Sequence, residues 1–154
     1  MGAGMSMTRD ELRDSARQAF GSDGLAPDAV ASWTNLSDMG WFMMTVPEAR
    51  GGLGLAGDAA AVIHYELGRA LVPGAAIAQM LTVEALTLAP PTDAVEALLA
   101  DAMTGTRLTA SLSPVGSASS GCVPDADLAS HVLVTEPGRV ALCPIANVTH
   151  RATW

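Results

Sequence analysis

Apolar residues recur at intervals of three and four positions through residues 9–103, which is the spacing of amphipathic helices. We expect five helices, over residues 9–20, 27–39, 58–71, 75–89 and 92–103. Thr8 and Glu11 have the spacing of a capping box at the start of the first helix. The fourth helix, residues 75–89, is apolar almost all round, so we expect it to be buried inside a bundle.

The pattern changes after Gly105 to short runs rich in β-branched residues. We expect strands over residues 107–112, 131–135 and 139–143. A hairpin turn at 136–138 joins the last two strands. The order predicts an α+β, mainly α protein, with an N-terminal helical bundle (residues 1–104) and a short incomplete antiparallel β region (residues 105–154). Three strands leave open edges that need further strands or another chain.

A glycine-rich stretch lies between the second and third predicted helices. The apolar run 41–46 meets Pro47, and Gly51, Gly52 and Gly54 follow within a few positions. Glycine adopts positive φ values and lets the backbone approach atoms that a Cβ would exclude. We therefore expect a tight, buried corner on which the neighbouring elements pack.

The third predicted helix carries two features that depend on its surroundings. Glu66 and Arg69 lie three apart and can pair, and we expect Glu66, like Glu48 and Glu84, to be a surface or helix-pairing charge. Gly68 costs the helix about 1 kcal/mol relative to alanine. Close approach of a neighbouring helix or a ligand would offset that cost. His64 lies beside the apolar stripe and is interpreted as structural.

Residues 52–57 formally spell G-x-G-x-x-G ahead of a helix. A dinucleotide site would need a strand directly before this motif and a second strand after the helix. Residues 47–51 intervene instead, and another helical segment follows. Asp58 would also set a negative charge where the phosphates belong. The motif therefore does not predict a nicotinamide-binding site.

The charge balance excludes several classes of partner. The net charge is −8, and all eight basic residues are arginine. An acidic chain without a basic cluster has no electrostatic footprint for nucleic acid or an anionic membrane. No run reaches the ~20 apolar residues of a membrane span, and the charged N-terminus is unlike a secretory signal, so we expect a cytoplasmic protein. Cys122 and Cys143 lack companions for a metal site, and we expect none.

Two linked motifs carry a resemblance to a known family. The first motif is VPEARGGLGL (residues 46–55), and the second, YELGRALVPG (residues 65–74), follows it closely along the chain. Together they resemble the N-terminal helical domain of the acyl-CoA dehydrogenases, over about residues 8–110. In that family a longer β domain and a C-terminal helical domain follow, so we interpret the chain as a truncated or partial member.

The resemblance implies an oxidoreductase of lipid metabolism that uses FAD and an acyl-CoA substrate. The catalytic base of the family lies in its C-terminal domain, so no residue of this chain is assigned as catalytic. Flavin contacts in the family come from a T-E-P-type segment, whose counterpart here is residues 110–114. Ser111 and Ser113 are therefore predicted to contact the cofactor, although the acidic residue is absent. Gln79 and Met80 are predicted to line the acyl pocket.

Three functional hypotheses remain open from the sequence. The first is a partial acyl-CoA dehydrogenase-like flavoprotein that acts in a homo- or hetero-oligomer and is not competent alone. The second is a non-catalytic helical assembly module that binds a partner and has lost the site. The third is an incomplete gene product without a stable role.

Overall fold

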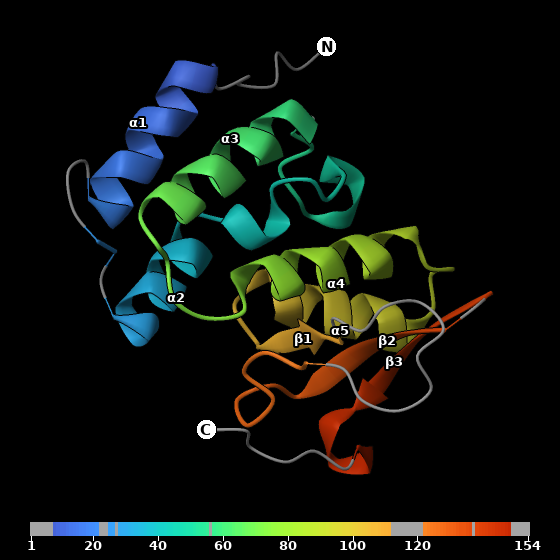
Figure 1. Ribbon diagram of the computed structural model, residues 1–154. Helices are drawn as coiled ribbons and strands as arrows, with labels where there is room; N and C mark the ends of the chain where they lie inside the picture. Colours follow the sequence, from blue (N-terminus) through green and yellow to red (C-terminus); the bar gives the residue numbers. More distant parts are fainter. Residues whose placement is uncertain are drawn as a thin grey trace. The chain divides into compact units, whose positions relative to one another are not determined.

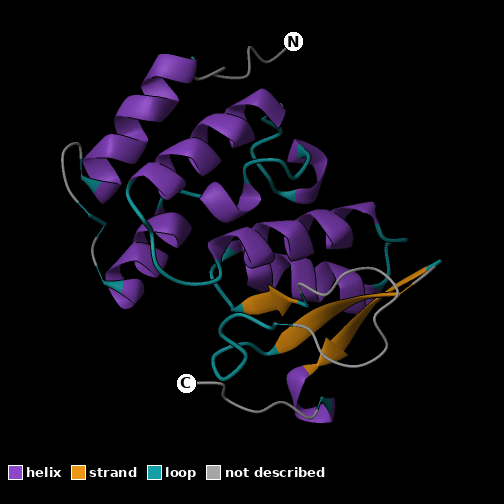
Figure 2. Cartoon of the chain, in the orientation of Figure 1, coloured by secondary structure: helices purple, strands orange, loops and turns teal. Residues whose placement is uncertain are grey.

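The computed structural model describes residues 8–21, 25–26, 28–55, 57–111, 122–136 and 138–148. The chain packs as two compact units, residues 1–73 and 74–154, and each is described by itself. Within the described residues, Figures 1 and 2 show helices and one small sheet, which confirms the predicted α+β, mainly α class. A division by packing does not test the predicted domain boundary at residues 104 and 105, which stays a prediction.

The first unit is helical. Its elements are α1 (Arg9–Phe20), α2 (Ala29–Asp38), η1 (Trp41–Met43), η2 (Glu48–Arg50) and α3 (Gly57–Arg69), where η denotes a short 3-10 helix. The predicted capping box at α1 is confirmed. The Glu11 N–H donates to the Thr8 hydroxyl, and the Thr8 N–H donates to the Glu11 carboxylate. Asp28 caps α2 by accepting the N–H groups of the first turn.

Two aromatic pairs lie in the core of the first unit. The ring centroids of Phe20 and Trp41 lie 5.3 Å apart, and those of Trp33 and Phe42 lie 4.7 Å apart. Each pair joins one helix, α1 or α2, to the η1 segment. All four rings are buried. The apolar run 41–46 is therefore the shared core of the unit, as expected for residues on which the neighbouring helices pack.

The second unit combines two helices with a three-stranded sheet in its described part. Its elements are α4 (Ala76–Leu88), α5 (Asp93–Met103), β1 (Leu108–Ala110), β2 (His131–Glu136), β3 (Arg139–Pro144) and η3 (Ile145–Asn147). The strand order is β1-β2-β3. β2 and β3 form the predicted antiparallel hairpin, but β1 and β2 are parallel, so the expectation of a purely antiparallel region is wrong at that pair. The long connection 111–130 makes the parallel crossover possible.

α4 packs on β1 of the sheet (Figure 1). Small side chains at Ala78 and Ala110 belong to this contact, together with Leu133 of β2. On another face of α4, Ile77, Leu81 and Leu88 are 59%, 51% and 78% exposed. The expectation that α4 is buried all round is therefore wrong. A helix lying on a sheet buries one face, whereas a helix at the centre of a bundle buries every face.

Gln79 ties α4 to both α5 and β1. Its side chain is fully buried. The amide nitrogen donates to the carbonyl oxygens of Ala102 and Thr106, at 3.0 and 2.9 Å. The amide oxygen accepts from the Leu108 N–H at 2.6 Å. These bonds join α4 to the end of α5 and the start of β1, and the bond from Leu108 satisfies a buried N–H group.

The helices in the described part of the chain are shorter than a bilayer is thick. The longest α-helices in the described part of the chain, α3 and α4, have 13 residues each. A membrane-spanning helix needs about 20 predominantly apolar residues. No helix among the described residues is therefore long and apolar enough to cross a membrane.

We predict that Gln79→Met destabilises the protein by about 2–4 kcal/mol, although methionine has a similar volume. The substitution leaves the buried Leu108 N–H without a partner and removes the hydrogen bonds that join α4 to the carbonyl oxygens of Ala102 and Thr106, and an orphaned buried donor alone costs roughly 1–3 kcal/mol. Urea unfolding followed by circular dichroism measures the change. Met80→Leu, a volume-conserving swap one position along, is the matched control and should change stability by less than about 1.5 kcal/mol. Equal stability of Gln79→Met and the natural protein would contradict the assignment.

Candidate functional site

The predicted glycine corner, residues 46–54, is tight as expected, but the expectation that it is buried is wrong, because Val46 is buried whereas Gly51, Leu53 and Gly54 are exposed. The chain doubles back on itself, and the Gly54 N–H donates to the Val46 carbonyl oxygen at 2.8 Å. Gly51 and Gly54 have φ values of 83° and 61°. A Cβ at Gly52 would overlap the carbonyl group of Val46. Each of the three glycines is therefore required by geometry, two for positive φ and one for close approach.

Glu66 of α3 lies at the centre of a cluster of arginines. Its side chain is 1% exposed. Arg69 of the same helix donates to its carboxylate, and the Nε atoms of Arg17 and Arg13 on α1 lie 3.4 and 3.9 Å from the carboxylate oxygens. We call these four residues the Glu66 cluster. The predicted pairing with Arg69 is confirmed, but the expectation that Glu66 is a surface charge is wrong.

The Glu66 cluster also binds the end of α1. The Arg69 Nη2 atom donates to the carbonyl oxygen of Gly21, the residue that follows α1, at 2.6 Å. Near the start of the same two helices, Arg9 donates twice to the Asp58 carboxylate, at 3.0 and 2.7 Å. α1 and α3 are therefore joined by polar contacts near both ends and at the middle.

The pKa of Glu66 reflects two opposed effects. Burial raises the pKa of the carboxyl group because it disfavours the charged form. Hydrogen bonds from Arg69 and Arg17, together with their charges, outweigh burial and hold the pKa of Glu66 below its ordinary value. Glu66 is therefore a structural anion at neutral pH, whereas a general acid or base would need a pKa close to the operating pH.

The expectation that a helix or ligand closely approaches α3 at Gly68 is not met by the described residues. No described atom lies within 4 Å of the position that its Cβ would occupy, and its φ is not positive. Neither a neighbouring helix nor the rest of the unit therefore requires glycine at this place in the described structure. Glycine at this position therefore lowers the stability of α3 relative to alanine, and no close contact with a described residue offsets that loss.

The predicted pocket residues Gln79 and Met80 lie in the second unit. Both donors and the acceptor of the Gln79 amide are used by backbone groups, so a substrate contact would have to replace one of these bonds. Met80 is 9% exposed. The assignment of these two residues to an acyl pocket stays a prediction.

The predicted cofactor residues are only partly described. Ser111 follows β1 and is half-buried, and its N–H donates to the Leu133 carbonyl oxygen at 2.8 Å. Ser113 lies outside the described residues. The described part of this segment thus supplies a single hydroxyl, which is too small a donor set to hold FAD, and no chemical step is derived through the cofactor from these residues. The cofactor assignment stays a prediction.

Among the described residues, no group of three His, Cys, Asp or Glu side chains is arranged to hold a metal ion.

Comparison with known proteins places the chain in a family. Residues 5–106 match the family model described as "Acyl-CoA dehydrogenase, N-terminal domain". The chain therefore belongs to the acyl-CoA dehydrogenase family. No curated protein gives a match.

Among solved structures, the chain is similar to the "Tcur3481-Tcur3483 steroid ACAD G363A variant", where ACAD stands for acyl-CoA dehydrogenase. The TM-score is 0.66 and the sequence identity is 26%. The alignment covers 87% of this chain and 46% of that one. The chain thus spans less than half the length of this structural relative.

Sequence reasoning missed the burial of Glu66 and its partners on α1. A signal was present, because Arg13 and Arg17 lie four apart and so share one face of α1, next to its apolar stripe. The spacing of arginines on one helix does not reveal which residue of another helix they meet. Only the packing of α1 on α3 supplies that information.

We predict opposite effects for two glycine substitutions. Gly52→Ala should destabilise the protein by about 3 kcal/mol or prevent folding, because the new methyl group meets backbone atoms that cannot move aside. Gly68→Ala should stabilise it by about 0.5–1 kcal/mol, because the space is open and alanine favours the helix. Thermal and urea unfolding measure both. A Gly52→Ala variant as stable as Gly68→Ala would show that the corner is not close-packed.

We predict that Glu66→Gln costs about 2 kcal/mol at pH 7, less than the roughly 3–5 kcal/mol of a fully buried pair because the arginines reach water. The pKa of Glu66 is lower in the folded than in the unfolded state. Its contribution is thus present above the unfolded-state pKa of about 4.3 and is lost as the pH falls through the folded-state value.

The stability gap between the natural protein and Glu66→Gln should therefore narrow when urea unfolding is repeated at progressively lower pH. Glu48→Gln, an exposed glutamate of the same unit, is the matched control and should change stability by less than about 0.5 kcal/mol. If the difference in unfolding free energy between the two proteins stays constant with pH, the ionised form of Glu66 is not the source of the stabilisation.

Proposed function

We propose that this chain forms the N-terminal part of an acyl-CoA dehydrogenase-like flavoprotein. The reaction would be the FAD-dependent α,β-dehydrogenation of an acyl-CoA thioester. The single observation that carries the proposal is the family match over residues 5–106, which contains the glycine corner and the Glu66 cluster. The glycines of the corner belong to the first motif of the resemblance, and Glu66 and Arg69 belong to the second. A Cβ at Gly52 would overlap the backbone, and Arg69 neutralises the buried Glu66.

The chain does not complete this reaction alone in our proposal. The reaction needs a carboxylate that removes the α-proton, and the family provides it from a C-terminal domain. FAD supplies the acceptor for the hydride from the β-carbon. Among the residues that the structure describes, the buried carboxylate is that of Glu66, which is paired with arginines and is not a candidate base. The base and most of the flavin contacts would come from further sequence or from another subunit.

An oligomer of unlike subunits agrees with the structural relative. Its description pairs two names, Tcur3481 and Tcur3483, and calls the protein a steroid ACAD. We propose that the present chain likewise acts beside a partner that supplies the missing lobe, and that a bulky, steroid-like acyl-CoA is the first substrate to test. The chain's 46% coverage of that relative supports the need for a second lobe.

A second function, a non-catalytic assembly module, has an observation in its favour. The segment that corresponds to the flavin-contacting motif, residues 110–114, carries no acidic residue. A chain that kept the helical packing and lost this group would bind its partner without binding flavin. Both proposals require the folded helices, so folding alone does not separate them.

Purification of the chain alone and after co-expression with acyl-CoA dehydrogenase-like subunits of the same organism separates the two. We expect the chain alone to be colourless and inactive, and the co-purified complex to be yellow and to reduce an electron-acceptor dye with an acyl-CoA. The partner expressed without this chain is the control. A stable but colourless complex would favour the assembly module, and a yellow, active single chain would contradict the requirement for a partner.

A further inference from the structure

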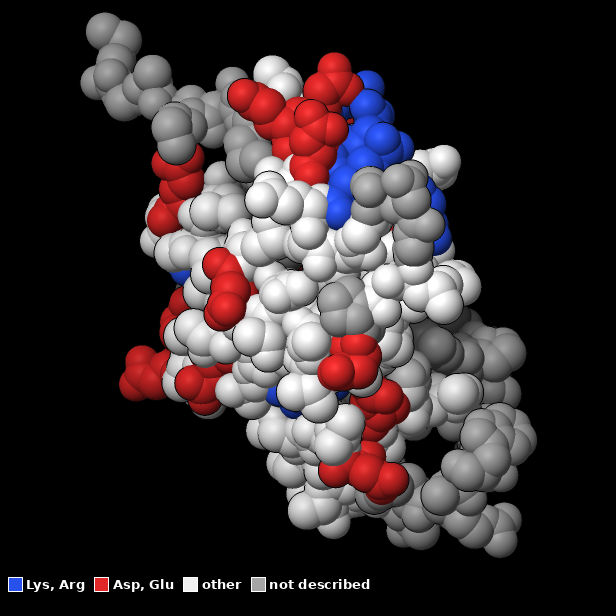
Figure 3. Space-filling view, turned by 90° about the vertical axis from the view of Figure 1, so that its left-hand side faces the viewer, with Lys and Arg blue, Asp and Glu red and all other residues white. Residues whose placement is uncertain are grey.

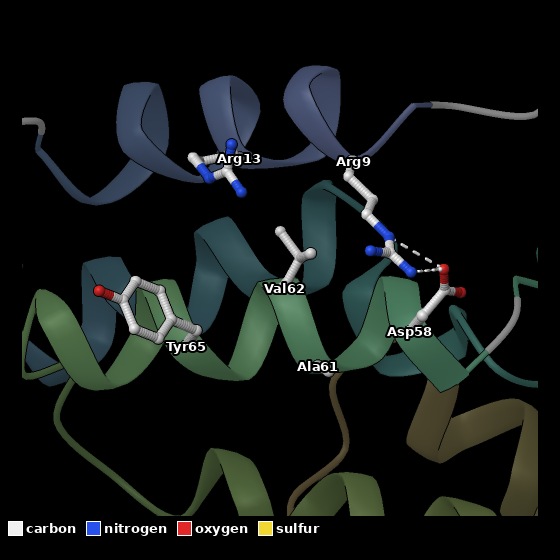
Figure 4. Close-up of a pocket in the computed structure, with 6 residues that line it drawn as sticks. All are labelled: Arg9, Arg13, Asp58, Ala61, Val62 and Tyr65. Carbon is white, nitrogen blue, oxygen red and sulfur yellow. Dashed lines mark hydrogen bonds and ion pairs between the residues drawn. The ribbon is translucent and has the colours of Figure 1, made fainter.

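The charged side chains of the groove between α1 and α3 neutralise one another (Figure 4). The groove is open and has a volume of about 290 Å³. Arg9 of α1 donates to Asp58 of α3, and Arg13 donates to Asp10 of its own helix, at 2.6 Å. Figure 3 shows basic side chains bordered by acidic ones on one face of the molecule. The charges of the described residues that line the groove therefore do not select a ligand.

An ion pair of the second unit joins segments that are far apart in the sequence. The Arg107 Nη1 atom lies 3.3 Å from the Asp125 carboxylate, and both side chains are partly buried. The same carboxylate oxygen accepts the N–H of Ala75, the residue before α4, at 3.0 Å. Asp125 therefore connects the start of α4 to Arg107, which directly precedes β1.

The residue before Asp125 also holds β1. The Thr109 hydroxyl donates to the Pro124 carbonyl oxygen at 2.6 Å, and Thr109 is fully buried. Two successive residues thus contact β1 and the residue that precedes it. We call residues 124 and 125, with their partners Ala75, Arg107 and Thr109, the Asp125 clasp.

The backbone at Asp125 takes a conformation that is uncommon for a residue other than glycine. Its φ is 51°, in the left-handed region, which aspartate and asparagine tolerate better than most residues. The Asp125 carbonyl oxygen accepts the N–H groups of Leu128 and Ala129, at 2.9 and 3.1 Å. A conformation of this kind persists where the surrounding contacts determine it. Here the carboxylate and the carbonyl group of the same residue supply those contacts.

The clasp also accounts for Gly74, the last residue of the second sequence motif. Its φ is 99°, and a Cβ at this position would lie 3.3 Å from the Asp125 Oδ2 atom and 3.9 Å from the Arg107 Nη1 atom. Glycine meets both requirements, a positive φ and space for the carboxylate. The motif that resembles the family therefore ends on a residue whose surroundings are set by Asp125, far along the chain.

The strand held by the clasp leads to a predicted cofactor residue. Ser111 follows β1, and its N–H donates to the Leu133 carbonyl oxygen at 2.8 Å, which extends the pairing with β2. Arg107 and Thr109 precede Ser111 by four and two positions. The clasp therefore acts on Ser111 through β1.

We propose that Asp125 is a positioning residue, which holds β1 against the start of α4 and so fixes the position of Ser111 at the end of the strand. The carboxylate acts through Ala75 and Arg107, and the turn that it stabilises keeps the Pro124 carbonyl oxygen on Thr109. The proposal rests on the proposed function in one respect, since Ser111 is predicted to contact the cofactor. Asp125 itself is assigned no contact with substrate or cofactor.

Two substitutions separate the carboxylate from the backbone conformation. Asp125→Asn keeps an acceptor for the Ala75 N–H and tolerates the left-handed region. Asp125→Gly adopts the same backbone conformation but removes the acceptor. If only the conformation mattered, glycine would serve as well as asparagine. Asp127→Gly, an exposed position two residues along, is the matched control.

Amide hydrogen exchange of the full chain, followed by NMR, is the measurement. In Asp125→Gly we expect the amides of Ala75 and Ser111 to exchange at least about tenfold faster relative to those of α5, because a hydrogen bond to a charged acceptor is lost and the end of β1 is released. In Asp125→Asn the increase should stay below about threefold, because an ion pair between partly exposed groups contributes little. Asp127→Gly should leave both amides unchanged. The α5 amides are the internal reference, since α5 lies in the same unit and outside the clasp.

Either of two results would overturn the proposal. One is exchange of Ser111 in Asp125→Gly that equals its exchange in Asp125→Asn, because the carboxylate would then not hold the end of β1. The other is an equal increase for Ser111 and the α5 amides, which would indicate a general loss of stability. The measurement requires neither flavin nor a partner. Failure of the proposed function would appear separately, as a colourless complex of the natural chain.

Discussion

A carboxylate that water cannot reach must be surrounded by donors, and in the first unit this requirement decides how α1 lies on α3. Glu66 is 1% exposed and meets guanidinium groups from both helices. If α1 moved away, the carboxylate would lose Arg13 and Arg17 and keep only Arg69 of its own helix. A buried charge with too few partners costs several kcal/mol. Burial of the apolar face of α1 drives its packing on α3, and the Glu66 cluster favours one position of α1 along α3.

The need of the buried carboxylate for donors also explains why an arginine lies three residues after Glu66 in this family motif. One guanidinium neutralises the buried carboxylate and also donates to the carbonyl oxygen of Gly21, where α1 ends. A lysine in its place would present a point charge and could not serve two acceptors through a fixed fork. The end of α1 is thus fixed by the residue that makes the burial of Glu66 tolerable.

The sequence predicted those features that depend on near neighbours in the chain. The capping box of α1, the hairpin between β2 and β3 and the corner at Gly51, Gly52 and Gly54 are decided by residues a few positions apart. It did not predict features that depend on distant partners. The parallel pairing of β1 with β2 and the burial of Glu66 arise from contacts between residues more than twenty positions apart. At Gly68 the sequence suggested a contact that is not found. Glycine is rare inside helices and led us to expect a close neighbour, but no described residue supplies one.

Two surfaces of the second unit favour contact with further protein segments. Within the described sheet, β1 and β3 each pair on one side only, so each offers a row of backbone groups to a further strand. On α4, Ile77, Leu81 and Leu88 are more than half exposed. Open strand edges and aliphatic helix faces favour aggregation when they remain in water. Both therefore favour an assembly in which other segments cover them, which agrees with a chain that spans 46% of its structural relative.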